Sequence, residues 1–569
     1  MTLANEARAP LFEALVRHAE AGHASFHVPG HKSGQAVREA GFAGGAGGSP
    51  GADRLDREDG DWLEAERRYY DALLRLDLTE ITGLDDLHQP EGAIREAEEL
   101  AAECFGAART FFLVGGSTVG NQAMILSVCG RDELLLVQRN VHKSVLHGLM
   151  LAGARAVFLP PKLDPLTGIA GGVEIADVRA ALDKYPEARG LLVTNPNYYG
   201  MAADLRELAE LLHAYGKPLL VDEAHGAHFG FHPELPPSAL ACGADLVVQS
   251  THKMLTAMTM GAMLHVGRAD SGMVGSGGHH GPVSERELRR TGAANADSAA
   301  GEVVTASVPV KPSPRVDVAA VARLLAMLQS SSPSYPILAS LDLARRRVHT
   351  AAGRAQLARG LAAAQSARRW LREQPWYGSL AEEGASPPGR GDALDPFKVT
   401  VWDATGTLNG YALQRELERL GCFAELATPE HALLAFGPAS TAEDAARLCA
   451  ALDAVARRHG LPDRPLRGPG ARPLPFPAAA SAEPVRFAVT GPAAGGSVRR
   501  VPLHAAAGHV AAAMVVPYPP GIPVLYPGER ITPGTAAYLQ QLAEQGARFH
   551  GTPSGKLTEL DIISTDEGT

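Results

Sequence analysis

Long hydrophobic runs are missing from this 569-residue sequence. No stretch approaches the roughly eighteen consecutive apolar residues that indicate a transmembrane helix, so we expect no membrane partner. The first residues, Met1–Arg8, lack the basic segment followed by an apolar stretch that is typical of a signal peptide. These absences predict a cytoplasmic protein.

Cysteine is also scarce. The five residues are Cys104, Cys129, Cys242, Cys422 and Cys449. No two of them have the CxxC spacing of a zinc site or redox motif, and their odd number fits reduced thiols better than a disulfide framework. The pair His279–His280 has no third metal ligand nearby, so we interpret it as part of a solvated loop and expect no bound metal.

Excess positive charge is absent too, because 53 basic residues face 63 acidic ones and the formal charge is −10. A surface that binds nucleic acid is normally basic, so this balance argues against a nucleic-acid partner. Apolar residues make up 45% of the chain and charged residues 20%, as in soluble globular proteins. The length is sufficient for two or three domains.

Changes in composition divide the chain into five parts. We predict an N-terminal arm over residues 1–80, a large domain over 81–335, a small α+β domain over 336–460, a proline-rich linker over 461–484 and a C-terminal module over 485–569. Residues 267–312 are rich in glycine, serine, alanine and threonine, and we interpret them as a flexible insertion in the large domain. Periodicity over Pro336–Trp370 predicts one long helix.

Short apolar segments alternate with helical patterns between residues 92 and 266. The expected strands are Arg109–Val114, Glu133–Val137, Arg155–Leu159, Gly190–Thr194, Pro218–Val221, Asp245–Gln249 and Ala262–Val266, and the expected helices are Ser117–Cys129, Val141–Ala152 and Asp204–Tyr215. This alternation is typical of an α/β fold with a doubly wound, mostly parallel sheet. Such sheets bind their ligands at the carboxyl ends of the strands.

Two chemically useful side chains follow strands at that edge. Asp222 directly follows Pro218–Val221, and Lys253 comes shortly after Asp245–Gln249. A lysine amine forms a Schiff base with pyridoxal phosphate, and a carboxylate keeps the pyridine nitrogen protonated so that the ring accepts electrons. The pair therefore predicts a pyridoxal-phosphate enzyme. A helix cap or a magnesium ligand is the alternative role for Asp222.

A phosphate site is expected at Gly115–Asn121, which follows one strand and begins a helix. Backbone N–H groups and the helix dipole favour an anion there, and Ser117 and Thr118 add hydroxyl donors. Ser250 and His252 are placed to reach the same phosphate. A dinucleotide fingerprint would need glycine at position 117, and an ordinary capped helix is the other alternative.

Two histidines complete the predicted cofactor site. His142 follows the strand Glu133–Val137 and is expected to stack on the cofactor ring, with a capping or surface role as the alternative. His225 lies three residues after Asp222. We expect it to orient the cofactor or Asp222, with a purely structural hydrogen bond as the alternative.

Further motifs extend this pattern along the chain. They are His27–Lys32, Asp77–His88, Gly116–Asn121, Asn140–Lys143, Asn195–Gly200, Val221–Gly226, Ser250–Lys253, Ser332–Asp342 and Tyr518–Pro523. In this order they resemble the Orn/Lys/Arg decarboxylase family of pyridoxal-phosphate enzymes, which has the aspartate-aminotransferase fold (fold type I). The resemblance implies that Lys253 carries the cofactor, that Asp222 faces its ring nitrogen and that His142 covers the ring. It also implies a phosphate site formed by Ser117, Thr118, Ser250 and His252.

The motif His27–Lys32 comes early, so the chain resembles the shorter, biosynthetic arginine decarboxylase type rather than members with an N-terminal wing domain. This resemblance implies that arginine is converted to agmatine and carbon dioxide for polyamine and spermidine biosynthesis, with lysine or ornithine as alternative substrates. It further implies a homodimer or a larger oligomer built from dimers. In such an assembly, Tyr518–Pro523 and the N-terminal arm are expected to complete a neighbour's pocket.

A basic amino-acid substrate needs an acidic partner for its cationic end. Asp85, Asp86 and Glu529 are candidates, although surface or capping roles are favoured for each. An aminotransferase of the same fold is a second hypothesis, and it would bind the α-carboxylate through a small-domain arginine that the sequence does not identify. A catalytically silent, regulatory relative is the third, and the intact Lys253 and Asp222 argue against it.

Overall fold

The structure is a computed structural model. It describes residues 6–21, 23, 25, 27–35, 54–269, 311–380, 393–463, 476–477, 483–488, 497–518, 521–550 and 555–564. Most of the predicted insertion 267–312, including His279 and His280, lies outside these residues, as does most of the predicted linker 461–484. Within them, no helix is long and apolar enough to cross a membrane, and no cluster of three potential ligand side chains could hold a metal ion.

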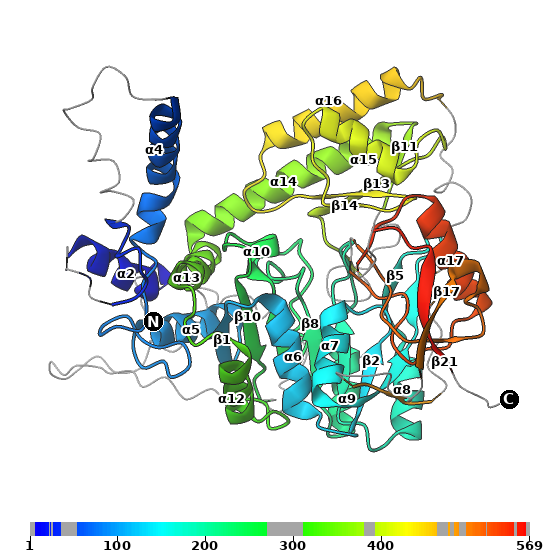
Figure 1. Cartoon of the computed structure of the whole chain (residues 1–569), viewed down its shortest axis with the longest axis horizontal. Coiled ribbons are helices and arrows are strands. Elements are labelled where there is room, and N and C mark those ends of the chain that lie inside the picture. The colour runs from blue at the N-terminus through cyan, green and yellow to red at the C-terminus, as the bar shows by residue number, and fades with distance from the viewer. Residues whose placement is uncertain are drawn as a thin grey trace, which may run out of the picture.

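An eight-stranded sheet forms the centre of the large domain (Figure 1). In spatial order its strands are β1 (Arg109–Leu113), β10 (Ala262–Val266), β9 (Leu246–Gln249), β8 (Leu219–Asp222), β6 (Leu191–Thr194), β2 (Leu134–Gln138), β3 (Arg155–Leu159) and β16 (Val485–Arg486). The run from β9 to β3 is parallel, whereas β10 is antiparallel to both of its neighbours and β16 is antiparallel to β3. The predicted α/β fold is confirmed, and each predicted strand lies within one residue of its expected ends.

Helices cover both faces of this sheet. They are α6 (Gly116–Val128), α7 (Lys143–Ala152) and α12 (Val318–Leu328) on one face, and α8 (Ile175–Lys184) and α9 (Arg206–Ala214) on the other. Successive residues of a strand point to opposite faces, so Val248 packs in the first layer and Val247 in the second. Because both faces are buried, the strands appear in the sequence as continuous apolar runs.

Two helices, α13 (Tyr335–His349) and α14 (Ala351–Glu373), replace the single long helix predicted over Pro336–Trp370, so that prediction is wrong. Thr350 separates them and caps α14 by accepting a hydrogen bond from the Gly353 N–H. A Cβ at Gly353 would lie 1.5 Å from a backbone carbonyl oxygen of α13. Glycine therefore permits a tight junction that the apolar periodicity does not reveal.

The small domain lies above the large one in Figure 1, with α14 and α16 packed on a four-stranded sheet in the order β11-β13-β15-β14. Its elements are β11 (Tyr377–Ser379), β13 (Lys398–Asp403), α15 (Gly410–Arg419), β14 (Leu426–Ala427), β15 (Ala432–Ala435) and α16 (Ala442–Arg458). A short ladder joins it to the large domain, because β12 (Ala393–Leu394) pairs with β7 (Met201–Ala202).

Three helices lie near the N-terminus: α2 (Pro10–Glu20), α4 (Arg54–Leu74) and α5 (Ala93–Phe105). Leu11 and Leu15 of α2 are fully buried among residues of α5 and α13. Asp342 of α13 accepts a hydrogen bond from the Leu11 N–H at 3.1 Å. The helix of the predicted arm is therefore part of the core beside β1 and β10, whereas α4 projects away from the sheet (Figure 1).

The C-terminal module lies beside the opposite edge of the sheet (Figure 1). Its elements are β17 (Ser497–Pro502), η1 (Leu503–Ala505), β18 (Val510–Ala511), β19 (Val516–Pro517), α17 (Pro533–Glu544), β20 (Phe549–His550) and β21 (Glu559–Ser564). The large domain also contains a short hairpin of β4 (Pro161–Leu163) and β5 (Ala170–Val173). Arg139, which follows β2, is buried and donates to the carbonyls of Pro523 and Val524 and to the Glu529 carboxylate. This contact fixes the module against the end of β2.

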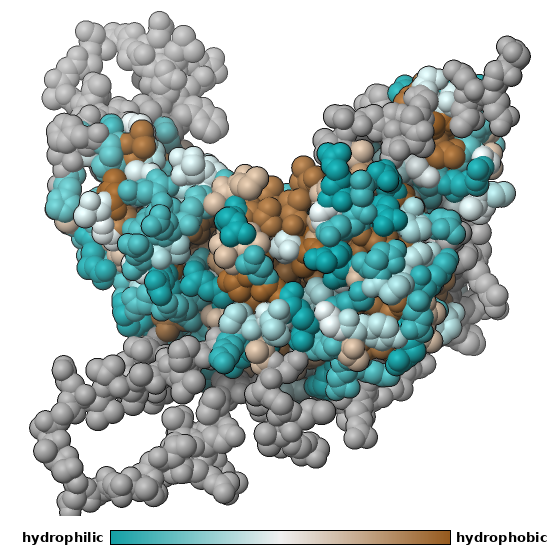
Figure 2. Space-filling view, turned by 90° about the horizontal axis from the view of Figure 1, so that it is seen from below, coloured by the Kyte–Doolittle hydropathy of each residue, from teal (hydrophilic) through white to brown (hydrophobic). Residues whose placement is uncertain are grey.

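Apolar residues gather in the middle of the face that is seen from below, with hydrophilic residues on both sides of them (Figure 2). Large hydrophobic side chains that are exposed on the large domain include Leu151, Met258, Met260 and Met327. An apolar area of this kind is typical of a surface that contacts another protein.

Candidate functional site

Four strands direct the candidate residues to one edge of the sheet. Gly115–Ser117 follow β1, His142 follows β2, Asp222 ends β8, and Ser250 precedes the short helix α10 (Thr251–Met254) after β9. Because these four strands run in the same direction, their carboxyl ends lie on the same side. The topology therefore brings together residues that are far apart in the sequence.

The expected phosphate site brings Ser117 and Ser250 into contact. The Ser250 hydroxyl donates to the Ser117 hydroxyl at 2.8 Å, at the first turn of α6. Thr118 lies exposed in the same turn. His252 is half-buried, and its Nδ1 contacts the Gly261 carbonyl at 2.9 Å. Paired hydroxyls at a helix N-terminus can accommodate an anion.

Asp222 is a buried carboxylate, with an exposed fraction of 2%. Asn121 donates to it from Nδ2 at 2.8 Å, and the Ala224 N–H donates at 3.1 Å. No cation pairs with it among the described residues. Burial raises the pKa of Asp222, because the carboxylate loses solvation that two neutral donors and the nearby charge of Lys253 only partly replace.

A hydrogen-bonded chain connects Asp222 to His142. Asn121 also donates to the Ser144 hydroxyl at 2.9 Å, and that hydroxyl lies 2.8 Å from His142 Nδ1. The Ser144 N–H donates to the same Nδ1, so we assign the proton of the neutral ring to Nε2. Burial, together with the charge of Lys253, lowers the pKa of His142 to about 3. The imidazole is therefore uncharged at neutral pH, as stacking on a cationic ring requires.

The C-terminal module packs against His142 through Gly521. Gly521 has φ +90°, and a Cβ at this position would lie 3.2 Å from His142 Nε2. Its carbonyl accepts a hydrogen bond from the Lys143 N–H at 3.2 Å. The motif Tyr518–Pro523, expected to complete a neighbour's pocket, thus contacts the site of its own chain through Gly521, while Pro519 and Pro520 lie outside the described residues.

Lys253 is accessible to solvent, and His225 beside it is buried. The Lys253 amine lies 3.2 Å from His225 Nε2 and 5.4 Å from the centre of the Tyr198 ring. Burial by surrounding protein atoms lowers the pKa of the Lys253 amine, and the negative charge of Asp222 opposes this shift. A lowered pKa favours the neutral form of the amine, which is the form that attacks a carbonyl group.

Four residues of the site were not identified from the sequence: Asn121, Ser144, Tyr198 and Lys398. Asn121 and Tyr198 lie in motifs quoted above, so their surroundings were recognised but their contacts were not. Lys398 comes from β13 of the small domain, and its Nζ lies 3.3 Å from His225 Nδ1. Its position depends on how the two domains pack, which no local pattern indicates.

The three acidic residues considered for the substrate side chain have other partners. Asp85 accepts hydrogen bonds from five backbone N–H groups at the start of α5 and nearby, those of Asp86, Glu91, Gly92, Ile94 and Arg95. Asp86 accepts from the His88 N–H at 2.8 Å. Glu529 pairs with the buried Arg139. These contacts favour the capping and structural roles.

The residues present fit pyridoxal phosphate. Asp222 is a buried carboxylate with no ion pair among the described residues, and a protonated pyridine nitrogen would supply one. Lys253 offers an accessible amine, and Ser117 with Ser250 offers an anion site. His142 provides an uncharged ring at the same edge.

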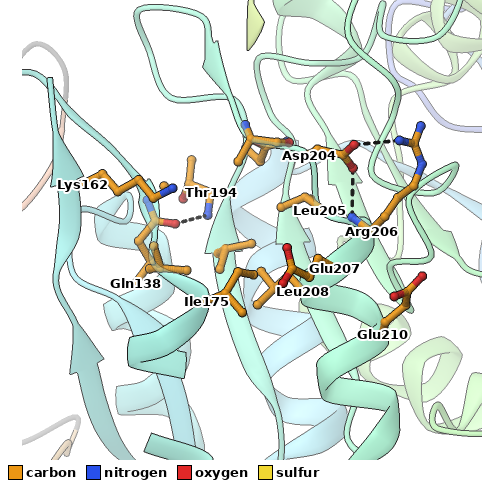
Figure 3. A pocket seen from close by; sticks show the side chains of 15 residues that line it. Gln138, Lys162, Ile175, Thr194, Asp204, Leu205, Arg206, Glu207, Leu208 and Glu210 are labelled. Carbon is orange, nitrogen blue, oxygen red and sulfur yellow. Dashed lines mark hydrogen bonds and ion pairs between the residues drawn. The ribbon is translucent and has the colours of Figure 1, made fainter. Parts of the chain in front are cut away.

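A separate cavity of about 440 Å³ lies on the side of α8 and α9 (Figure 3). It is lined by Gln138, Thr194, Lys162 and the first turn of α9, and by none of the predicted site residues. Both basic side chains that line it have acidic partners: Arg206 pairs with Asp204 at 2.7 Å, and Lys162 with Glu174 at 3.4 Å. The cavity is not part of the candidate site.

Two family models match the chain. The model of the family described as "Orn/Lys/Arg decarboxylase, major domain" matches residues 60–275 and 297–382, and the model of that family's C-terminal domain matches residues 487–554.

Individual relatives cover nearly the whole chain. The chain is 36% identical to the uncharacterized protein YaaO of Bacillus subtilis, over 98% of this chain and 99% of that protein. It is 32% identical to an arginine decarboxylase of Bacillus anthracis, over 97% of each. Among solved structures, lysine decarboxylase A from Pseudomonas aeruginosa superposes with a TM-score of 0.70 at 25% identity, covering 98% of this chain and 80% of that one.

Replacing Asn121 tests the support of Asp222. We expect Asn121→Ala to weaken the binding of pyridoxal phosphate about tenfold. Without this donor the pKa of Asp222 rises further, so the carboxyl group keeps its proton more readily and loses the charge that would face the ring nitrogen. Affinity is measured by titrating the cofactor-free protein and following visible absorbance.

Gln122→Ala is the matched control, since Gln122 is the next amide on α6 and has no contact with Asp222. An unchanged affinity in Asn121→Ala would contradict the assigned role of this hydrogen bond.

Proposed function

Since this chain belongs to the Orn/Lys/Arg decarboxylase family, and is thus a pyridoxal-phosphate-dependent decarboxylase, we propose that its substrate is arginine and its products are agmatine and carbon dioxide. The relative from Bacillus anthracis, which is named an arginine decarboxylase, supports this choice. The lysine decarboxylase of known structure is less similar, and lysine or ornithine is the second candidate. The observation that carries the proposal is the juxtaposition of Lys253, Asp222 and His142 at one sheet edge.

Each side chain has a separate task in this proposal. Lys253 attaches the cofactor, Asp222 lies against its ring nitrogen, and His142 covers one face of its ring. Ser117 and Ser250, assisted by Thr118 and His252, bind its phosphate. The bound cofactor supplies an electron sink for the electron pair that the departing carboxylate leaves on Cα.

A proton must replace the carboxylate at Cα. Lys253 and His225 both carry exchangeable protons, and the Lys253 amine lies 3.2 Å from His225 Nε2. We propose that Lys253 returns this proton and that His225 holds the amine in place. Overall, arginine takes up one proton and releases one molecule of carbon dioxide.

Glu425 is our candidate partner for the guanidinium group. It lies in the small domain just before β14, and its side chain is exposed. Burial lowers the pKa values of Lys253 and Lys398, and the negative charge of Glu425 acts on both in the opposite direction. The Glu425 carboxylate is therefore close enough to the site to interact electrostatically with both amines. A carboxylate at the mouth of the site suits a planar cation that extends away from the cofactor.

We also propose that the protein is a cytoplasmic homodimer that contributes to polyamine biosynthesis. The apolar area in the middle of the face shown in Figure 2 supports an interface. The five cysteines are free thiols, which is in keeping with a reducing compartment.

The substrate is tested by incubating the cofactor-loaded enzyme separately with L-arginine, L-lysine and L-ornithine. We expect carbon dioxide release with arginine to exceed that with the other two at least about tenfold, since only arginine offers a planar, bidentate cation. Mass spectrometry should identify agmatine. Faster release from lysine or ornithine would replace arginine as the substrate, and release from none would contradict the proposal.

Removal of the Glu425 charge tests the head-group partner. We expect Glu425→Gln to raise the KM for arginine about tenfold with a smaller change in kcat, because the contact lies far from the breaking bond. Glu443→Gln is the control, since Glu443 is an exposed carboxylate at the start of α16 in the same domain. Equal effects of the two substitutions would contradict the assignment.

A further inference from the structure

His225 lies between two lysine amines. Its Nε2 is 3.2 Å from the Lys253 amine, and its Nδ1 is 3.3 Å from the Lys398 amine. The ring and Lys398 are both buried, with exposed fractions of 4% and 1%. The Tyr198 ring packs against the imidazole of His225, with 4.4 Å between the ring centres. One imidazole therefore links the large domain to the small one inside the site.

Hydrogen-bond chemistry limits the charges that this arrangement can carry. Burial, together with the nearby amines, keeps the pKa of His225 well below its ordinary value, so the ring is neutral. A neutral imidazole has one N–H donor and one acceptor nitrogen, whereas an ammonium group only donates. If both amines were charged, both ring nitrogens would have to accept. One of Lys253 and Lys398 is therefore neutral when both contacts are made.

The surrounding charges identify which amine keeps its proton. The groups that face the three residues are Asp222 of β8, His142 before α7, His228 after β8, Asp395 before β13 and Glu425 before β14. Asp395 is buried and lies 3.0 Å from His228. His228 and Lys398 hold the pKa of Asp395 below its ordinary value, although burial acts in the opposite direction. An ionised carboxylate thus stays beside Lys398.

Once the cofactor is bound, Asp222 no longer stabilises the charged form of Lys253. Asp222, whose charge favours the protonated amine, is the group that the proposed function assigns to the cofactor ring nitrogen. The positive charge of Lys398 acts on Lys253 in the opposite sense and favours its neutral form.

We propose that Lys398, acting through His225, is a positioning residue that holds the Lys253 amine in the neutral form that captures the cofactor carbonyl. The Lys398 ammonium donates to His225 Nδ1, which fixes the ring proton on Nε2, facing the unprotonated Lys253. Gly200 makes room for this, because a Cβ there would lie 2.8 Å from the Lys398 side chain. This inference rests on the proposed role of Lys253 but requires no particular amino-acid substrate.

The experiment measures how fast the full-length, cofactor-free chain captures pyridoxal phosphate between pH 6 and pH 10. Visible absorbance reports the capture, and no amino acid is present. Lys398→Met removes the positive charge and raises the pKa of Lys253, so the neutral fraction falls. We expect capture about tenfold slower at neutral pH, with the native rate recovered about one pH unit higher. Lys398→Arg keeps the charge and should retain the native pH profile.

A second measurement uses no cofactor. The rate of acetylation of Lys253, followed by mass spectrometry, should shift with pH in the same direction in Lys398→Met. Lys217→Met is the control, since the Lys217 amine is held by the carbonyls of Pro186 and Ala188 outside the site. Lys398→Gln serves as the second neutral variant where Lys398→Met does not fold.

Three results would overturn the proposal: an unchanged pH profile in the neutral variants, a loss of rate that is equal at every pH, or a Lys398→Arg profile like that of Lys398→Met. A failure to decarboxylate arginine would leave these capture rates unaffected, so the two proposals fail separately.

Discussion

The site depends on a negative charge held away from water. Asp222 ends a central strand, is almost fully buried, and receives only neutral donors from Asn121 and Ala224 among the described residues. Burying a carboxylate without a cation is unfavourable, and the surrounding core must offset this cost. A cofactor with a protonated ring nitrogen would remove the imbalance, which supports the role that we propose for Asp222 in binding pyridoxal phosphate.

Three parts of the chain converge on this charge. The large domain supplies the strand ends, the C-terminal module places Gly521 against His142, and the small domain brings Lys398 to His225. Each contact crosses between parts that are remote in the sequence. The packing of the domains therefore controls the site, and Arg139, which holds the C-terminal module to the end of β2, contributes to that control.

Much of this arrangement could be predicted from the sequence. The strand ends that position Asp222, Ser250 and Ser117 were found because buried parallel strands appear as short apolar runs, and their carboxyl ends meet at one edge. Contacts between domains could not be found in this way. Lys398 lies inside an apolar strand pattern, and only the packing of β13 against the large domain places its amine beside His225.

Local geometry that periodicity does not encode was also missed. The break between α13 and α14 depends on the Thr350 cap and on the absence of a side chain at Gly353, while the helical pattern continues across it. The acidic candidates Asp85 and Glu529 could not be assigned from the sequence, because a carboxylate that caps a backbone turn looks the same as one that binds a ligand.

The central claim is that Lys253 and Asp222 hold opposite ends of one pyridoxal phosphate molecule. Its most direct test is to reduce the cofactor-loaded protein with borohydride, digest it and locate the pyridoxyl group by mass spectrometry. The account predicts that the label lies on Lys253. A label on Lys398 or on any other lysine, or no label at all, would contradict it.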